Sequence, residues 1–327
     1  MSDQRSLEVN PDLLLAFERG LDPHRPERSK IPARILGYGE ISTVFEILAP
    51  GLEGLACKRL PIFRSVEELA RYRAAYLEYS RLLQEEVGLR LPRHGFASLR
   101  DDAGYPICYI IQEKLPPQSI GNRAIQQLSP GEVCRLVEKT LHEIGKVWSF
   151  DRRQREIQVA LDGQISNWSI AGFDPQRPSL GDEVALVYMD TSTPLFRVGG
   201  REQLNPELFL RSAPSFLAWV LRLLYLKEVV NRYYNLRLVV MDLIANMYKE
   251  QRADLVPPLV EVANRFLADE AAYLEAKPLT VDEVRAYYRE DATIWSAYQA
   301  ARRLDRFLRA RLLRRRYPYI LPERIRR

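Results

Sequence analysis

The sequence has little of what disulfide-stabilised and zinc-binding proteins need. Its 327 residues include only three cysteines and three histidines. The cysteines are odd in number and lack metal-ligand spacing, so we expect reduced, buried thiols in a cytoplasmic protein rather than a disulfide framework. The histidines are scattered and form no cluster with cysteine, so we expect no zinc site. These residues are Cys57, Cys108, Cys134, His24, His94 and His142.

Long apolar runs, repeats and low-complexity linkers are also missing. The N-terminus, MSDQR, is not followed by the apolar core of a targeting signal. The most hydrophobic stretch, residues 216–226, is interrupted by Arg222 and bounded by Lys227 and Glu228, so we expect a buried core helix there and no transmembrane segment. With 46% hydrophobic and 28% charged residues, the chain is typical of a globular protein large enough for two lobes.

A glycine-containing turn is the first feature that suggests chemistry. Residues 34–36 and 43–48 alternate apolar and polar side chains, which predicts two strands joined by the sequence GYGEIS at residues 37–42. Glycine allows main-chain N–H groups to approach phosphate oxygens closely, because no side chain intervenes. The turn is therefore either a phosphate-binding loop or an ordinary hairpin.

Lys58 lies in the next predicted strand, residues 55–60, with apolar neighbours on both sides. A lysine rooted in a sheet needs an anionic partner, although a solvated lysine at a sheet edge is the alternative. A helix is predicted next, because Ser65 and Glu68 form a capping box and apolar side chains recur at helical spacing. Glu78 lies inside that helix and is either a surface charge or the partner that orients Lys58. The recurring side chains are Leu69, Tyr72, Tyr76, Tyr79 and Leu83.

In this order, the segments resemble the protein-kinase-like superfamily, which includes protein kinases and the small-molecule phosphotransferases related to choline and aminoglycoside kinases. The family pattern G-x-G-x-x-G-x-V has a serine in place of its third glycine here, and the A-x-K of the third strand is also present. The resemblance spans residues 35–193, about half of the chain. The matching positions are Gly37, Gly39, Ser42, Val44, Ala56 and Lys58.

The resemblance implies roles for both ends of a nucleotide site. Residues 37–44 would cover the phosphates of ATP, Lys58 would contact them, and Glu78 would hold Lys58. The apolar strand at residues 109–115 falls where the family has the hinge between its lobes. Glu113 and Leu115 would then offer main-chain groups to the adenine edge.

The second half of the predicted site carries the acidic residues. Asp162 and Asn167 have the family's D-x-x-x-x-N spacing, and Asp190 follows the apolar strand of residues 184–189. By resemblance, Asp162 orients the hydroxyl of the acceptor, while Asn167 and Asp190 are oxygen ligands for Mg²⁺. A plain loop with the turn-forming pair Asp162-Gly163 is the alternative. The two segments together predict a hairpin with its polar tip at residues 174–178.

Departures from the family pattern reduce the range of activities that the resemblance implies. Ala160 replaces the histidine that usually comes two residues before the catalytic aspartate, and Thr191-Ser192 replaces the usual Phe-Gly after Asp190. No Ala-Pro-Glu signature and no long activation segment follow. These differences argue against a protein-modifying kinase and favour a divergent small-molecule phosphotransferase.

The remainder of the chain predicts an α+β, bilobal fold. A short helix capped by Asn10, with Pro11 in its first turn and Gly20 at its end, precedes the sheet. Beyond Asp190 the pattern is almost entirely helical, with helix starts at Pro206, Pro214, Pro257-Pro258 and a second capping box at Thr280–Glu283. We expect an N-terminal helical extension at residues 1–30, an antiparallel-sheet N-lobe at 31–113 and a helical C-lobe at 114–327.

Arginine is concentrated at the C-terminus. Residues 301–327 contain eleven arginines and two acidic residues, a formal charge of +9, so the other residues sum to −4 because the chain is +5. An apolar face flanked by Arg302, Arg303, Arg306 and Arg309 predicts a helix docked on the large lobe with a solvated basic side. A contact surface for an acidic partner, nucleic acid or an anionic membrane is the alternative. The apolar face is formed by Leu304, Phe307, Leu308 and Leu312.

Two functions follow from the sequence. The first is an ATP- and Mg²⁺-dependent phosphotransferase that acts on a small hydroxyl- or amine-bearing acceptor. The second is a pseudokinase-like nucleotide-binding or scaffolding protein without transfer activity, suggested by Ala160 and Thr191-Ser192. The five polar residues Lys58, Glu78, Asp162, Asn167 and Asp190 favour the first, because a scaffold has no chemical need for them.

Overall fold

The computed structural model describes residues 6–23, 25–39, 41–181, 183–211, 230–309, 317 and 319–321. Four expectations lie outside the described residues. They are the core helix at 216–226, the helix start at Pro214, the position of Leu312 and that of Glu40 in the turn.

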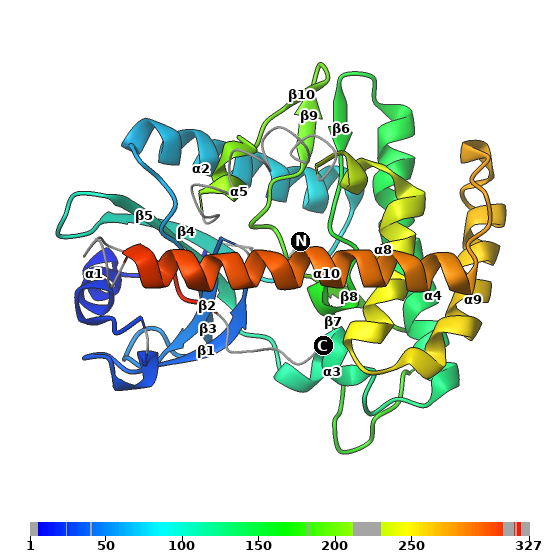
Figure 1. Ribbon diagram of the computed structural model, residues 1–327, viewed down its shortest axis with the longest axis horizontal. Helices are drawn as coiled ribbons and strands as arrows, with labels where there is room; N and C mark the ends of the chain where they lie inside the picture. Colours follow the sequence, from blue (N-terminus) through cyan, green and yellow to red (C-terminus); the bar gives the residue numbers. More distant parts are fainter. Residues whose placement is uncertain are drawn as a thin grey trace.

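A five-stranded antiparallel sheet forms the N-terminal part, with the strand order β1-β2-β3-β5-β4 (Figure 1). The hairpin predicted around the glycine turn is β1 and β2, and Lys58 lies in β3, which pairs with both β2 and β5. The strands are β1 (Ala33–Tyr38), β2 (Thr43–Ile47), β3 (Leu55–Leu60), β4 (His94–Arg100) and β5 (Pro106–Glu113).

A different helix covers each face of this sheet. Helix α1 (Pro11–Gly20) buries Leu14 and Phe17 against the face that carries Phe45 and Tyr109. Its start is as predicted, because the side chain of Asn10 accepts a hydrogen bond from the N–H of Asp12. A buried ion pair between Arg59 of β3 and Glu18 of α1, at 2.5 Å, fixes the helix on the sheet.

Helix α2 (Val66–Arg81) packs on the other face and continues into a π-helical turn at Leu82–Val87. All five residues of its predicted apolar stripe are buried. At its start, Ser65 accepts a hydrogen bond from the N–H of Glu68, whereas the carboxylate of Glu68 pairs with Arg211 and does not complete the capping box. The helical spacing therefore predicted the buried face of α2 correctly.

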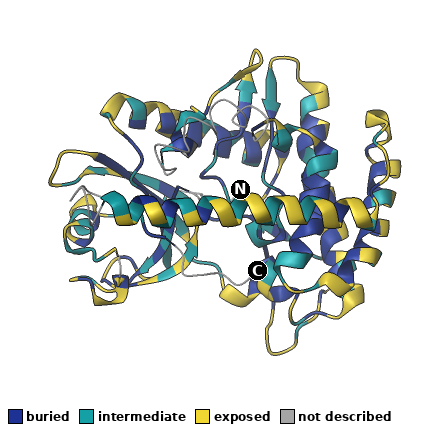
Figure 2. Cartoon of the chain, viewed as in Figure 1, coloured by how far each residue is buried: buried dark blue, intermediate teal, exposed yellow. Residues whose placement is uncertain are grey.

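The C-terminal part is mostly helical and encloses the largest core. Buried apolar side chains from α4, α8 and α9 meet there, as the concentration of dark blue in Figure 2 shows. A second small sheet has the order β10-β9-β6, and β7 pairs with β8 as the predicted hairpin. These elements are α3 (Gly121–Ala124), α4 (Pro130–Arg153), α5 (Glu207–Leu210), α8 (Leu236–Lys249), α9 (Val256–Asp269), β6 (Ile157–Val159), β7 (Trp168–Ile170), β8 (Leu186–Tyr188), β9 (Phe196–Val198) and β10 (Arg201–Glu202).

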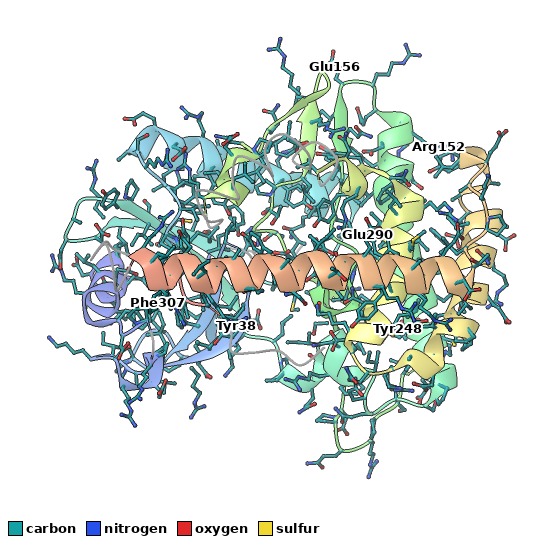
Figure 3. All side chains as sticks on the ribbon, in the orientation of Figure 1. Tyr38, Arg152, Glu156, Tyr248, Glu290 and Phe307 are labelled. Carbon is teal, nitrogen blue, oxygen red and sulfur yellow. The ribbon has the colours of Figure 1, made fainter. Side chains whose placement is uncertain are left out.

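Helix α10 (Val281–Phe307) connects the two parts of the molecule. It begins with the predicted capping box at Thr280 and Glu283, packs on α8, and ends beside the sheet (Figure 1). In Figure 3, Glu290 lies toward the helical part and Phe307 lies at the sheet end of the helix.

The expected orientation of the second half of α10 is wrong. Leu304 and Phe307, predicted to dock, are 50% and 52% exposed, whereas Arg302, predicted to flank the docked face on the solvated side, is buried, as is Asp305. Aromatic rings explain part of this inversion, because the guanidinium of Arg302 lies over the rings of Tyr298 and Tyr319.

The structure confirms the α+β, bilobal fold class, with a small antiparallel-sheet part and a larger helical part. The residue limits proposed for the three segments remain a prediction. In the part of the chain that the structure describes, no helix combines the length and the apolar character needed to cross a membrane.

Candidate active site

Lys58 and Asp190 meet, although 132 positions separate them in the sequence. The Nζ atom of Lys58 donates hydrogen bonds to Oδ1 of Asp190 at 2.8 Å and to Oγ of Ser192 at 2.6 Å. Ser192 in turn donates to the same oxygen of Asp190 at 2.8 Å. The side chains of Lys58 and Asp190 are 19% and 22% exposed, so the pair is largely shielded from water but still reachable.

Two main-chain contacts hold Asp190 at the end of its strand. Asp190 follows β8 by two residues, and the N–H of Met189 donates to the carbonyl of Asn167 at 2.9 Å. Gln112 of β5 donates its Nε2 to the carbonyl of Met189 at 2.9 Å, which links this loop to the N-terminal sheet. Burial raises the pKa of Asp190, but the charge of Lys58 and the hydrogen bonds from Lys58 and Ser192 outweigh it, so the pKa lies below its usual value. Asp190 is therefore anionic at neutral pH.

The loop that carries Asp162 and Asn167 is held closed by its own hydrogen bonds. Asn167 donates its Nδ2 to the carbonyl of Asp162 at 3.1 Å, and the N–H of Gln164 donates to Oδ1 of Asp162 at 3.1 Å. Gly121 of α3 lets the loop lie close, because a Cβ atom at this position would come within 2.3 Å of the carbonyl oxygen of Ile165. The loop is therefore a hydrogen-bonded turn, as the pair Asp162-Gly163 suggests, and it also brings Asp162 and Asn167 together.

Two nearby aspartates act on Asp162 in this region. Burial raises the pKa of Asp162 to about 7, and the nearby carboxylates of Asp242 and Asp190 add to the effect. Asp242 comes from α8. Arg232, which precedes that helix, donates to Oδ1 of Asp242 at 3.1 Å, and the hydroxyl of Tyr287 of α10 donates to the same atom at 3.1 Å. Asp162 therefore titrates near neutral pH, whereas Asp190 does not.

The oxygen atoms available at this place suit a hard divalent cation. Asp190 supplies a carboxylate, and Asn167 has its amide oxygen available because its Nδ2 is used by the loop. Carboxylate and amide oxygens are ligands that Mg²⁺ accepts, usually together with water and phosphate. No group of three or more histidine, cysteine, aspartate or glutamate residues within the described ranges could hold a metal by itself. The donor set fits a metal that arrives with a phosphate ligand.

The glycine turn joins β1 to β2, and β2 lies beside β3, the strand that carries Lys58. Val44 of β2 is paired directly with Lys58 of β3. The turn is closed by a hydrogen bond of 3.0 Å from the N–H of Gly39 to the carbonyl of Ser42, and a Cβ atom at Gly39 would lie only 2.5 Å from Oγ of Ser42. Gly37 has open space around it. A side chain at Gly39 would therefore displace the hydroxyl of Ser42, which is buried in the turn.

The predicted hinge residues follow the sheet as expected. Glu113 is the last residue of β5, and Leu115 comes two residues later in the connection to the helical part. The N–H of Glu113 donates to the carbonyl of Arg93 at 2.9 Å, and the N–H of Lys114 donates to that of Gly54 at 2.8 Å. These bonds fix the start of the connection, and a contact of Glu113 and Leu115 with adenine remains a prediction.

Glu78 does not meet Lys58, which corrects the expected pairing. Its carboxylate binds Arg81 at 2.9 Å and its side chain is 42% exposed. The reason is the register of α2, which turns Tyr72, Tyr76 and Tyr79 inward and Glu78 outward.

Helix α2 contacts the site through tyrosine hydroxyl groups and not through the carboxylate of Glu78. The hydroxyl of Tyr72 donates to the carbonyl of Ser192, and that of Tyr79 to the carbonyl of Ala160, both at 2.7 Å. Helix α2 thus holds the segments that contain Asp190 and Asp162 by main-chain contacts. The helical spacing of the three tyrosines predicts their burial but not the hydrogen bonds of their hydroxyl groups.

The sequence patterns do not predict two further residues of the site. Ser192 differs from the family pattern, and Asp242 lies in no motif. The available signal for Asp242 is a charge within the otherwise apolar stretch LVVMDLIA, because an aspartate is rarely buried without a partner.

Comparison with known proteins gives weak structural matches. The structure titled "WaaP in complex with acyl carrier protein" is 15% identical, with 72% of this chain and 89% of the other covered and a TM-score of 0.31. The "Structure of the GDP complex of wild-type aminoglycoside 2'-phosphotransferase-IIIa" is 10% identical, with 76% and 95% covered and a TM-score of 0.33. Neither similarity is strong enough to support an argument about function.

Curated protein sequences provide no match. A family model does: the one described as "Family of unknown function (DUF6206)" matches residues 24–306, and the chain belongs to this family.

Proposed function

We propose that the protein is an ATP- and Mg²⁺-dependent phosphotransferase whose acceptor is a small molecule with a hydroxyl or amine group. The observation that carries the proposal is the contact between Lys58 and Asp190 beside Asp162, a residue whose pKa is raised. An ion pair alone could be structural, but here it lies near a second carboxyl group, that of Asp162, whose pKa is raised. Together these groups are what transfer of a phosphoryl group requires.

Lys58 and Asp190 would exchange partners when the nucleotide binds. In the present structure they neutralise each other, and Ser192 holds both. With triphosphate present, Lys58 would turn its Nζ to phosphate oxygens, and the carboxylate of Asp190 would become free to bind a cation together with Asn167. Bound Mg²⁺ would neutralise charge on the phosphate oxygens.

Asp162 would act on the acceptor. A carboxylate whose pKa lies near 7 can accept a proton from a hydroxyl or ammonium group more readily than an ordinary aspartate. The hydrogen bond from the N–H of Gln164 fixes one of its oxygens and leaves the other to face the acceptor. Asp162 would therefore align the attacking atom and take up its proton.

Asp190→Asn is the variant that tests the activity. We expect metal-dependent release of ADP, measured over a panel of hydroxyl- and amine-bearing metabolites, to fall at least about 100-fold, because the charge that balances the cation is lost. Asp151→Asn is the control for loss of a partly buried carboxylate, since Asp151 accepts its hydrogen bond from the N–H of Val159 and not from Lys58 or Ser192. Unchanged turnover in Asp190→Asn, with an intact fold, would remove this aspartate from the mechanism.

A nucleotide-binding or scaffolding protein without transfer activity is the second candidate. It is favoured by the position of Glu78, because Lys58 then lacks the glutamate that orients the corresponding lysine in the protein-kinase-like superfamily. Thermal unfolding with and without ATP and Mg²⁺ separates the candidates when it is combined with the ADP assay. Stabilisation by the nucleotide without turnover of any acceptor would favour the scaffold.

A further inference from the structure

The second half of α10 turns an apolar face to the outside of the molecule. Ile294, Leu304 and Phe307 are 50%, 50% and 52% exposed, whereas Arg302 and Asp305, on the opposite side of the same turns, are buried. Figure 2 shows exposed residues along α10 where it crosses the front of the molecule. The spacing of three and four residues places the apolar side chains on one side of the helix. This outer face of α10 is formed by Ile294, Ala297, Ala301, Leu304, Phe307 and Leu308.

The outer face carries no charge, and the chain around its C-terminal end is strongly basic. Between Asp291 and Glu323 the sequence has eight arginines and a single acidic residue, Asp305. Asp305 is 7% exposed and binds Arg309 at 3.0 Å, so it brings little negative charge to the surface. An apolar ridge of about four helical turns is therefore followed by a segment of high positive charge.

An anionic lipid surface matches both properties. A helix with an apolar face and arginines beside it lies in the headgroup region, with its apolar side chains toward the acyl chains and its cations at the phosphates. Nucleic acid matches only the arginines, because its phosphates are contacted by charged groups and the outer face has none. A second copy of the chain matches only the apolar side chains, because it carries the same basic segment.

We propose that the outer face of α10 binds the surface of a bilayer that contains anionic lipid. Leu304 and Phe307 would enter the boundary between the headgroups and the acyl chains, because both already face outward. Arg303, next to Leu304 in the helix, and the positive charge of the C-terminal segment would be attracted to the lipid phosphates. Binding would be reversible and would need both contributions, because the apolar area is small. It involves neither ATP nor Lys58 and Asp190, so it is independent of the proposed function.

Sedimentation with lipid vesicles tests the proposal on the wild-type chain without nucleotide. One set of vesicles consists of phosphatidylcholine, and the other of phosphatidylcholine and phosphatidylglycerol in equal amounts. The protein should sediment with the second set and remain in solution with the first. The bound fraction should fall as sodium chloride is raised from about 0.1 M to about 1 M, because the screening length then shortens from ~10 Å to ~3 Å.

A double substitution tests whether the outer face itself is used. Leu304→Gln with Phe307→Gln keeps every arginine, and the lipid concentration needed for half-maximal binding should rise at least about 10-fold, because two apolar side chains no longer leave water. Leu77→Gln with Val198→Gln is the matched control, since these side chains of α2 and β9 are 43% and 41% exposed. The control should bind vesicles like the wild type, and thermal unfolding shows whether both double variants fold.

Equal sedimentation with both sets of vesicles, no sedimentation at all, or undiminished binding by Leu304→Gln with Phe307→Gln would overturn the proposal. A wild-type dimer that this variant converts to a monomer, without binding to vesicles, would assign the outer face to a second copy and would also overturn it. The same holds for binding of duplex DNA that is lost in this variant while vesicles are not bound. Should the double variant fail to fold, Ile294→Gln takes its place, because Ile294 is equally exposed on the same face.

Discussion

Helices α2 and α10 both approach the candidate site, but they turn opposite kinds of side chain inward. Helix α2 buries Leu69 and Tyr72 and leaves the carboxylate of Glu78 outside. The second half of α10 buries Arg302 and leaves Leu304 exposed. Both sequences are amphipathic, so amphipathicity alone does not decide which face is covered.

The two helices also contact the site through different residues. From α2, Tyr72 contacts the carbonyl of Ser192, whose side chain binds Asp190. From α10, Tyr287 contacts Asp242, whose charge raises the pKa of Asp162. One helix thus supports the position of an anionic aspartate, and the other supports the charge state of a second aspartate that titrates near neutral pH.

Paired leucine truncations should separate the two helices most clearly. Leu69→Ala removes a side chain that is 6% exposed and should lower the free energy of unfolding by about 2–4 kcal/mol. Leu304→Ala removes one that is 50% exposed and should change it by less than about 0.5 kcal/mol. Chemical denaturation of both variants measures the difference. An equally large loss in Leu304→Ala would mean that α10 docks by its apolar face after all.

Loss of a single hydroxyl from α2 should have the next largest effect. Tyr72→Phe leaves the buried carbonyl of Ser192 without its donor, so we expect a loss of about 1–2 kcal/mol in the free energy of unfolding. Tyr248→Phe is the control, because Tyr248, labelled in Figure 3, stacks on Tyr288 and its hydroxyl has no hydrogen-bond partner among the described residues. If both variants lose the same stability, the contact with Ser192 contributes nothing specific.

The same contrast explains which features could be predicted from the sequence. The start of α1 and the buried stripe of α2 follow from local spacing, whereas the convergence of Lys58 and Asp190 is implied only by the resemblance to the protein-kinase-like superfamily. The inward turn of Arg302 depends on Tyr319, which comes seventeen positions later in the sequence and covers it from outside the helix. The direction of Glu78 depends on which residues of α2 meet the sheet, where a shift of one residue exchanges a tyrosine for a carboxylate. Such features are set by tertiary contacts that the spacing within one helix does not encode.

The raised pKa of Asp162 predicts that the stability of the protein depends on pH. Because the pKa of Asp162 is raised from 3.8 to about 7, the folded protein binds more protons than the unfolded chain between these values. The stability contributed by protonated Asp162 is therefore present below pH 4 and is lost as the pH rises toward 7. Asp162→Asn carries no such charge, so its stability relative to the wild type should increase over this range.

The expected gain of Asp162→Asn at pH 8, relative to pH 4, is about 1–2 kcal/mol. The value is set below the full ~1.4 kcal/mol per pKa unit because the side chain is only partly shielded and is coupled to its neighbours. Urea denaturation at both pH values measures it, with Asp269→Asn, an exposed position at the end of α9, as the control. A gain that is equal at pH 4 and pH 8 would show that the carboxyl group of Asp162 does not titrate between them.

Glu78 should give the smallest effect and the sharpest test of how α2 supports Lys58. Its carboxylate is 42% exposed and binds Arg81, and exposed pairs of this kind contribute roughly 0–1 kcal/mol. We expect Glu78→Gln to leave both the free energy of unfolding and the binding of ATP with Mg²⁺, followed by thermal shift, close to wild-type values. Tyr72→Phe should weaken that binding, since it disturbs Ser192, which holds Lys58 and Asp190 together. The reverse order, with nucleotide binding lost in Glu78→Gln and kept in Tyr72→Phe, would mean that α2 rotates when the nucleotide binds and brings the glutamate to Lys58 as the resemblance first implied.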